Sequence, residues 1–322
     1  MSAMRADEQQ LHLVVAAVVP EADGVVSLVF RTQDGSDLPE WGPGSHVDLH
    51  LPGVITRQYS LNSSPYDRST WRISVLLEPE SRGGSVAVHN EVHEGDVVEV
   101  HGPRNHFMFV ESADYFFIAG GIGITPILPM IEEAERAGAN WRLMYGGRTR
   151  SSMAFLDELA AYGDRVLVRP QDEFGHLDLA SWLTTPVEGT MVYACGPGPL
   201  LTAVVDLCEA WPPGSLHFER FTAVPFVLPE GESEKSFEVV CEESGITVTV
   251  GADQGILQAL EGAGLSLPFS CREGTCGTCE TGVIEGIPDH RDSYLSEEER
   301  SYNDTMMICV GRSLTPRLVL DL

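Results

Sequence analysis

Basic residues are scarce in this chain of 322 residues. Only 20 lysines and arginines stand against 48 aspartates and glutamates, which leaves a formal net charge of −28 at pH 7. Binding to DNA, RNA or an anionic membrane requires a basic face that can neutralise phosphate groups. The composition therefore excludes nucleic acid and membrane surfaces as expected partners. The hydrophobic content of 43% is typical of folded domains, and a domain size of about 150 residues predicts two or three of them.

Long apolar runs are also absent. The longest uncharged stretch, Tyr115–Ile131, is interrupted by glycine and proline and is too short to span a bilayer. The polar segment from Met1 to Gln10 lacks the apolar core of a signal peptide. The seven cysteines are an odd number, which fits a disulfide framework poorly. Free cysteines without a secretion signal predict a cytoplasmic protein.

Short Val- and Leu-rich segments fill the first third of the chain and are separated by turn dipeptides such as Asp34-Gly35. Their regular spacing predicts an antiparallel β-barrel over residues 1–108. Between 109 and 225 the pattern changes to strands that alternate with helices, beginning with the apolar strand 115–119. This alternation predicts an α/β domain with a parallel sheet covered on both faces.

Clustered charge and two prolines lie between 222 and 236, and a linker is expected at 226–236. Residues 237–322 contain a predicted hairpin, a short helix, a loop dense in cysteine and a further helix with Ser296 as its expected N-cap. The segment 226–322 holds 18 acidic and 6 basic residues. The sequence therefore predicts a third domain of α+β type, more acidic per residue than the rest.

The strongest chemical signal is a set of four cysteines spaced C-x4-C-x2-C and then, after 29 further residues, C: Cys271, Cys276, Cys279 and Cys309. This is the plant-type [2Fe–2S] spacing, in which one loop supplies three thiolates and a distant strand the fourth. Gly274 and Gly277 would let the backbone wrap around a compact cluster. A structural zinc site usually uses C-x2–4-C pairs instead, and four unliganded thiols are an unlikely use of this spacing. The cluster is the favoured interpretation.

With these cysteines, the chain resembles the phthalate dioxygenase reductase family over nearly all residues from about 12 to 322. The similarity rests on the loop SCREGTCGTCETG, the segment MMICVGRS, and the segments RQYSL and GGIGITP. The resemblance implies a multidomain chain: a flavin-binding antiparallel barrel, a nicotinamide-binding α/β domain, and a β-grasp ferredoxin domain.

The segment RQYSL matches the R-x-Y-S-L flavin motif of the ferredoxin reductase superfamily. The resemblance implies Arg57 at the flavin phosphate, Tyr59 and Ser60 at the isoalloxazine ring, and Leu61 within the same motif. An aromatic ring can stack on a flavin, a hydroxyl can bond its N5 atom, and a guanidinium can pair with phosphate. The alternative is an ordinary strand with a surface arginine.

A second element, Gly83-Gly84-Ser85, opens a helix, and backbone N–H groups at a helix start suit an anion. The resemblance places the phosphate of FMN there, although Ser85 would also be a good N-cap. No clear segment for an adenine half is visible, so FMN is favoured over FAD.

The nicotinamide motif follows a strand and opens a helix, and its residues Gly120, Gly121, Gly123 and Thr125 match the GGxGxTP pattern of the superfamily. Tight packing is the alternative explanation. At the last strand of this domain, the resemblance implies Cys195 beside the nicotinamide C4 atom, with Gly196 and Pro197 completing the motif. An ordinary buried cysteine is the alternative there.

Arg148 follows a strand at the sheet edge where ligands bind, and could hold a 2′-phosphate, a ribose or a pyrophosphate. Arg150 lies close in the chain, and Asp172 and Glu173 would oppose a 2′-phosphate if they lay nearby. The family favours NADH, with NADPH as the alternative. The resemblance also implies that Phe221 covers the flavin face, so that Ser60, Cys195 and Phe221 are the expected catalytic residues; a core phenylalanine is the alternative at 221.

Together the parts predict the reductase component of an oxygenase system, which passes electrons from NADH through FMN and the cluster to a separate terminal oxygenase. The favoured acceptor is a Rieske-type oxygenase that hydroxylates or demethylates an aromatic substrate, with a cytochrome P450 as the alternative. A non-catalytic ferredoxin-like carrier or redox sensor is the alternative of another class. A monomer is expected. The histidines lack ligand spacing and are expected to be satisfied or exposed: His46, His89, His101 and His106.

Overall fold

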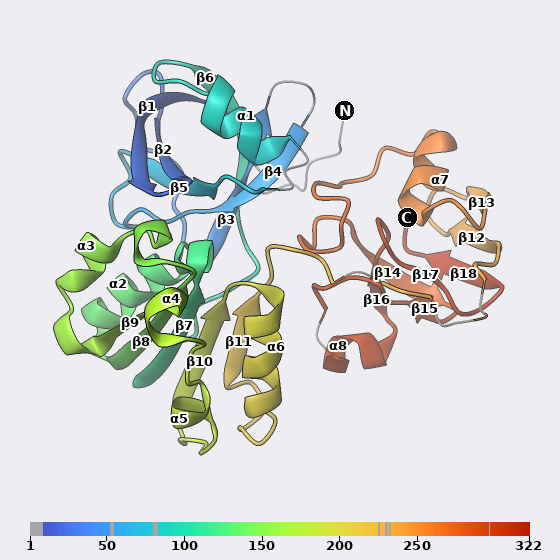
Figure 1. Ribbon diagram of the computed structural model, residues 1–322. Helices are drawn as coiled ribbons and strands as arrows, with labels where there is room; N and C mark the ends of the chain where they lie inside the picture. Colours follow the sequence, from blue (N-terminus) through green and yellow to red (C-terminus); the bar gives the residue numbers. More distant parts are fainter. Residues whose placement is uncertain are drawn as a thin grey trace. The chain divides into compact units, whose positions relative to one another are not determined.

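The computed structural model describes residues 9–51, 55–79, 83–224, 226–228, 231, 233–295 and 297–322. The chain divides into two compact units, an N-terminal unit (Glu8–Phe221) and a C-terminal unit that contains Thr222–Leu322 (Figure 1). Positions 229, 230 and 232 of the expected linker, and the expected N-cap Ser296, lie outside the described residues. In the described part of the chain, no helix is both long enough and apolar enough to cross a membrane.

The first part of the N-terminal unit is a six-stranded antiparallel sheet with one helix, α1 (Gly84–Glu91). Its strands are β1 (Gln10–Ala22), β2 (Val25–Arg31), β3 (Ser45–Leu51), β4 (Ile55–Ser60), β5 (Trp71–Leu76) and β6 (Val97–Asn105), in the spatial order β4-β3-β6-β1-β2-β5. Side chains alternate between the two faces of a strand. In β3, Val47, Leu49 and Leu51 are buried in the barrel core, so His50 lies on the opposite face.

The second part of this unit is a five-stranded parallel sheet in the order β11-β10-β7-β8-β9. Its strands are β7 (Asp114–Gly120), β8 (Asn140–Gly147), β9 (Val166–Pro170), β10 (Thr190–Cys195) and β11 (Leu216–Glu219). The helices are α2 (Ile127–Ala137), α3 (Leu156–Ala160), α4 (Gln171–Phe174), α5 (Ala180–Leu183) and α6 (Gly198–Leu207), with 3-10 turns η1 (Gly121–Ile124), η2 (Arg150–Ser152) and η3 (Gly163–Arg165).

Both faces of this parallel sheet are covered, as its apolar strands require. One hydrophobic cluster includes residues of α2 and α3, and another includes residues of α5 and α6. The carboxyl ends of β7, β8, β9, β10 and β11 therefore lie along one edge, which is where ligands bind in parallel sheets of this type.

The C-terminal unit is built on a mixed five-stranded sheet in the order β13-β12-β18-β14-β16. Its elements are β12 (Phe237–Cys241), β13 (Thr247–Val250), α7 (Ile256–Gly262), β14 (Glu280–Glu285), β15 (Pro288–Asp289), α8 (Glu297–Tyr302), β16 (Thr305–Met307), β17 (Arg312–Ser313) and β18 (Arg317–Leu320). One apolar core lies between this sheet and α7. The predicted multidomain fold class is therefore confirmed, whereas the boundaries at 108, 225 and 236 stay predictions.

Ion pairs and hydrogen bonds tie the described part of the expected linker to the C-terminal unit. Glu234 pairs with Arg291 at 2.6 Å and with Arg312 at 2.8 Å. The guanidinium of Arg291 lies over the ring of Phe226, at 4.0 Å from the ring centre. The N–H of Val224 donates to the Ser293 hydroxyl at 2.9 Å. These contacts all lie within the C-terminal unit, which begins at Thr222.

Candidate functional site

The four expected cluster ligands converge in the C-terminal unit. Cys271, Cys276 and Cys279 come from the loop before β14, and hydrogen bonds link Cys271 with Cys276 and with Cys309, and Cys279 with Cys309. The hydrogen bonds from Cys276 and Cys309 lower the pKa of the Cys271 thiol, which favours the thiolate that a metal ligand requires. Cys309 was expected within a strand, and this was wrong: it lies in a turn between β16 and β17. A strand would point alternate side chains to opposite faces, whereas the turn lets Cys309 approach the loop.

The loop backbone fits a compact metal–sulfur group. Gly274 and Gly277 have φ values of +71° and +69°, in the left-handed region that favours glycine. A Cβ atom at Gly277 would lie 2.5 Å from the Tyr294 ring. The N–H of Glu273 donates to the Cys271 sulfur at 3.3 Å, and the Ser270 hydroxyl is buried without a hydrogen-bond partner among the described residues. Inward donors and convergent thiols are what a [2Fe–2S] cluster requires.

The first half of the flavin motif is brought against the start of α1. Arg57 on β4 lies so close to Gly84 that a Cβ atom at Gly84 would be 2.5 Å from Arg57 Cγ. Gly83 caps the helix with φ of +93°. The Ser85 hydroxyl accepts a hydrogen bond from the Glu78 N–H at 3.1 Å, which ties the helix start to the segment after β5. A guanidinium beside a helix N-terminus is a suitable site for a phosphate.

The remaining residues of the flavin motif, Tyr59, Ser60 and Leu61, differ in how deeply they are buried. Tyr59 is half-buried, and burial raises its pKa to about 12. Ser60 ends β4 and is buried. Leu61 is fully buried and its side chain packs in the barrel core. The motif therefore offers a ring and a hydroxyl to a ligand, while its leucine fixes the strand end.

Ser60 meets the edge of the parallel sheet, where it hydrogen-bonds the carboxylate of Glu219. Strand register places Glu219, the last residue of β11, beside Cys195, the last residue of β10. Burial raises the pKa of the Glu219 carboxyl to about 8, although the hydrogen bond from Ser60 opposes this shift. Burial and the neighbouring Glu219 raise the pKa of the Cys195 thiol well above its usual value. A hydroxyl, a thiol and a carboxyl thus meet between barrel and sheet.

Glu219 was not singled out from the sequence, although the segment HFERF contains it. Its position two residues before Phe221 gives no indication of chemistry. Only the register of β10 with β11 places its carboxyl next to a strand-end cysteine. Phe221 itself follows β11 and is 43% exposed, so the alternative of a core phenylalanine does not hold.

The two glycine motifs pack directly against each other. A Cβ atom at Gly123 would lie 2.3 Å from the Cys195 carbonyl oxygen, and one at Gly120 would lie 2.7 Å from Pro197. Gly196 approaches Gly120 with similar closeness. Thr125 is buried and donates to the Ile122 carbonyl at 2.9 Å, which closes the turn before α2. Gly121, in contrast, has open space around its Cα. Tight packing therefore explains Gly120, Gly123 and Gly196, and leaves the loop backbone at the ligand edge of the sheet.

Acidic residues do lie close to the two arginines after β8. Arg150 forms a two-point contact with Glu173 of α4, at 3.0 Å and 2.8 Å. The N–H of Asp172 donates to the Arg148 carbonyl at 3.2 Å. Arg148 is exposed and forms no ion pair within the described part of the chain. The positive charge of Arg150 is already paired, which disfavours a 2′-phosphate at this point.

Comparison with known proteins agrees with this arrangement. Residues 239–313 match the 2Fe-2S iron-sulfur cluster binding domain. The chain is 44% identical over 314 residues to the phenoxybenzoate dioxygenase subunit beta of Ectopseudomonas oleovorans, which covers 97% of each chain. It is similar to the solved structure of phthalate dioxygenase reductase, with a TM-score of 0.72, 33% identity, and coverage of 97% of this chain and 98% of the other.

A second solved structure is an intact type IV self-sufficient cytochrome P450 monooxygenase. The TM-score is 0.89 and the identity 42%, over 97% of this chain and 41% of that chain. This chain therefore corresponds to less than half of that larger protein.

Proposed function

The chain belongs to the phthalate dioxygenase reductase family and is a flavin- and iron–sulfur-dependent oxidoreductase that serves an oxygenase; on this premise we propose that its acceptor is a separate Rieske-type oxygenase acting on an aromatic substrate. The observation that carries the choice of acceptor is the 44% identity, over 97% of each chain, to a phenoxybenzoate dioxygenase subunit. The four converging cysteines and the group of Ser60, Cys195 and Glu219 support the electron route that leads to this acceptor. When bound, NADH, FMN and the [2Fe–2S] cluster supply hydride transfer followed by single-electron transfer.

The residues at the barrel would hold the flavin by its two ends. Arg57 and the start of α1, with Gly83, Gly84 and Ser85, would bind the FMN phosphate. Tyr59 would contact the ring system and keeps its phenol protonated, because burial raises its pKa to about 12. The lack of a Cβ atom at Gly84 leaves room for the arginine.

The group of Ser60, Cys195 and Glu219 would lie where nicotinamide and flavin meet. Glu219 holds a proton at neutral pH because burial raises its pKa to about 8. It can then donate or accept a hydrogen bond without placing a full charge in a dry site. The Cys195 thiol also stays neutral. Phe221, exposed at the end of β11, would cover the flavin face.

The residues at the sheet edge would bind the dinucleotide. The loop Gly120–Thr125 precedes α2 at the carboxyl end of β7, where its backbone N–H groups would bind the pyrophosphate together with Gly196 and Pro197. Arg148 would contact the ribose or pyrophosphate. The ion pair of Arg150 with Glu173 supports NADH as the donor, because a 2′-phosphate would meet an acidic side chain.

A cytochrome P450 is the second candidate acceptor. It is favoured by the similarity to a chain that carries a cytochrome P450 monooxygenase. The alternative of a non-catalytic carrier or redox sensor is set aside, because the phthalate dioxygenase reductase similarity spans 97% of the chain rather than the ferredoxin segment alone. We include a cytoplasmic location in the proposal, since all seven cysteines are unbridged, and we keep the expected monomeric state as part of it.

Reconstitution tests the acceptor. The holoprotein is combined with a purified Rieske-type oxygenase or with a P450, and NADH-dependent product formation is measured for each. We expect turnover with a Rieske partner that falls as ionic strength rises, because residues 226–322 carry 18 acidic against 6 basic residues. Turnover with the P450 alone would replace the proposed acceptor. A turnover rate that does not change with ionic strength would show that the acidic residues do not contribute to docking.

A further inference from the structure

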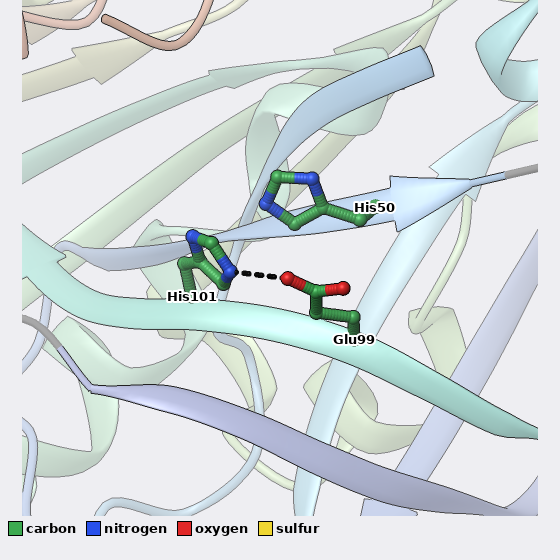
Figure 2. A group of neighbouring side chains, drawn as sticks. All are labelled: His50, Glu99 and His101. Atoms are coloured by element: carbon green, nitrogen blue, oxygen red, sulfur yellow. Dashed lines mark hydrogen bonds and ion pairs between the residues drawn. The ribbon is translucent and has the colours of Figure 1, made fainter. Parts of the chain in front are cut away.

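A cluster of metal-ligating side chains lies on the first sheet, away from the sites described above. His50 of β3 and Glu99 and His101 of β6 each offer one ligand atom, and these atoms all lie within 4.8 Å of one another. Figure 2 shows the three side chains pointing toward one another from the two neighbouring strands. We propose that His50, Glu99 and His101 form a binding site for a divalent transition metal of the zinc class.

Strand geometry explains why these residues meet. Glu99 and His101 are two apart on β6 and therefore share a face. The antiparallel register places His50 directly opposite Glu99, and the His50 and His101 rings lie 4.1 Å apart between centres. The sequence gave no sign of this group, because 48 residues lie between His50 and Glu99. The expectation that His46, His89, His101 and His106 lack ligand spacing was made from the sequence alone, in which strand register is not visible.

The hydrogen bonds around the cluster hold its members in place. The Nδ1 atom of His50 is 3.0 Å from the Thr56 hydroxyl, so Nε2 is the nitrogen that would bind the metal. A hydrogen bond on the second ring nitrogen is the usual arrangement for a metal-binding histidine. The Nε2 atom of His101 and the side-chain amide of Gln10 both contact Glu99 Oε1 at 2.7 Å. Metal binding would replace the proton shared between His101 and Glu99.

The donor set selects the metal. Two imidazole nitrogens and one carboxylate oxygen suit zinc and related transition metals rather than calcium or magnesium, which prefer oxygen ligands. Zinc ligands in a tetrahedral site lie about 3.3 Å apart. Side-chain rotations that move the ligand atoms by about 1 Å would therefore bring the three groups around an ion. The neighbouring Asp48 is already paired with Arg104 at 2.6 Å. Three protein ligands leave a coordination position for water.

The location indicates a structural rather than a redox role. Thr56, which contacts His50, alternates along β4 with Arg57 and Tyr59, so these two residues of the flavin motif project from the other face of the sheet. A metal here would join β3 to β6, the two neighbouring strands of the barrel sheet. Because the ion binds the folded chain, it would raise thermal stability as its concentration exceeds the dissociation constant.

The experiment is a calorimetric titration of the intact holoprotein with zinc sulfate, with the melting temperature recorded in parallel. We expect one zinc ion per chain and a higher melting temperature. His50→Gln and His101→Gln should each weaken zinc binding by about tenfold or more and abolish the rise in melting temperature. His176→Gln, at an exposed histidine between α4 and α5, is the matched control and should bind like the wild type.

Flavin and cluster absorbance are recorded for each variant, so that a fold defect is separated from a lost ligand. NADH-dependent cytochrome c reduction without added zinc should be the same in all four proteins. Zinc binding of unchanged affinity in a His50→Gln/His101→Gln double variant would overturn the proposal and place the ion on other groups, such as the cysteines. No heat of binding in the wild type would also overturn it and leave the group as a hydrogen-bonded polar network.

Discussion

The two units build their sites in different ways. In the C-terminal unit, three of the four ligand cysteines share one loop, and the loop shape is set locally by Gly274 and Gly277. In the N-terminal unit, Ser60 comes from the antiparallel sheet while Cys195 and Glu219 come from two strands of the parallel sheet. A loop site depends on local backbone conformation, whereas an assembled site depends on strand register and on the packing of two sheets. We therefore expect a ligand substitution to remove one function cleanly and packing substitutions to have graded effects.

The sharpest separation of the two units comes from Cys309→Ser. Loss of one thiolate should remove the cluster, and cytochrome c reduction should fall by about 100-fold or more, because the electrons then lack their carrier. NADH-dependent ferricyanide reduction, which needs only the flavin, should stay within about twofold of wild type. Iron content and visible absorbance check the cluster. Cys208→Ala, at a buried cysteine far from the loop in sequence, is the control; normal cytochrome c reduction in Cys309→Ser would refute the electron route.

Gly123→Ala tests the assembled site. The new Cβ atom would lie 2.3 Å from the Cys195 carbonyl oxygen, so the two glycine motifs must separate. We expect NADH-dependent ferricyanide reduction to fall by about 10- to 100-fold, as displacements of about 1 Å do at reacting centres, with the cluster spectrum retained. The matched control is Gly198→Ala. Gly198 is the first residue of α6, and a Cβ atom there would meet nothing within 4 Å, so this variant should keep full activity. Equal behaviour of the two variants would contradict the close-packing argument.

Glu219→Gln tests the buried carboxyl through pH. The folded pKa of about 8 lies above the ordinary value of 4.5, so the folded state binds a proton that the unfolded state releases between these values. The stabilisation that this proton gives is present below pH 4.5 and is lost as pH rises toward 8, by about 1 kcal/mol per pH unit. Denaturant unfolding at pH 5, 6.5 and 8 should show the wild type losing stability relative to Glu219→Gln. A constant difference between the two proteins would mean that Glu219 is ionised in the fold.

The smallest effect is expected at the dinucleotide edge. Glu173→Ala releases Arg150 from its ion pair and should improve the preference for NADPH over NADH by about fivefold, since exposed charge pairs contribute little. The ratio of kcat/KM for the two nucleotides measures this. Glu209→Ala, at an exposed acid elsewhere in the unit, should leave the ratio unchanged. A shift of this ratio toward NADH in Glu173→Ala would show that Arg150 does not bind the nucleotide.

This contrast also explains how much could be predicted from the sequence. The cysteine spacing predicted the convergence of Cys271, Cys276, Cys279 and Cys309, because three of these ligands are close in the chain and the distant fourth completes the plant-type pattern. Regularly spaced short strands predicted the antiparallel sheet of the N-terminal unit, and the alternation of strands and helices predicted its parallel sheet. Glu219 was missed because its role depends on a neighbour 24 residues earlier on another strand. The group of His50, Glu99 and His101 was missed for the same reason, because strand register cannot be inferred from the spacing of residues along the sequence.

The contacts of Glu234 also bear on how the cluster unit is joined to the rest of the chain. Val224 and Glu234 are both bound to partners in the C-terminal unit, so the described residues between them follow that unit. A segment fastened at both ends to one body is not a flexible spacer, and its length does not set an effective concentration. The described part of the expected linker therefore belongs to the cluster unit and is not a separate tether outside it.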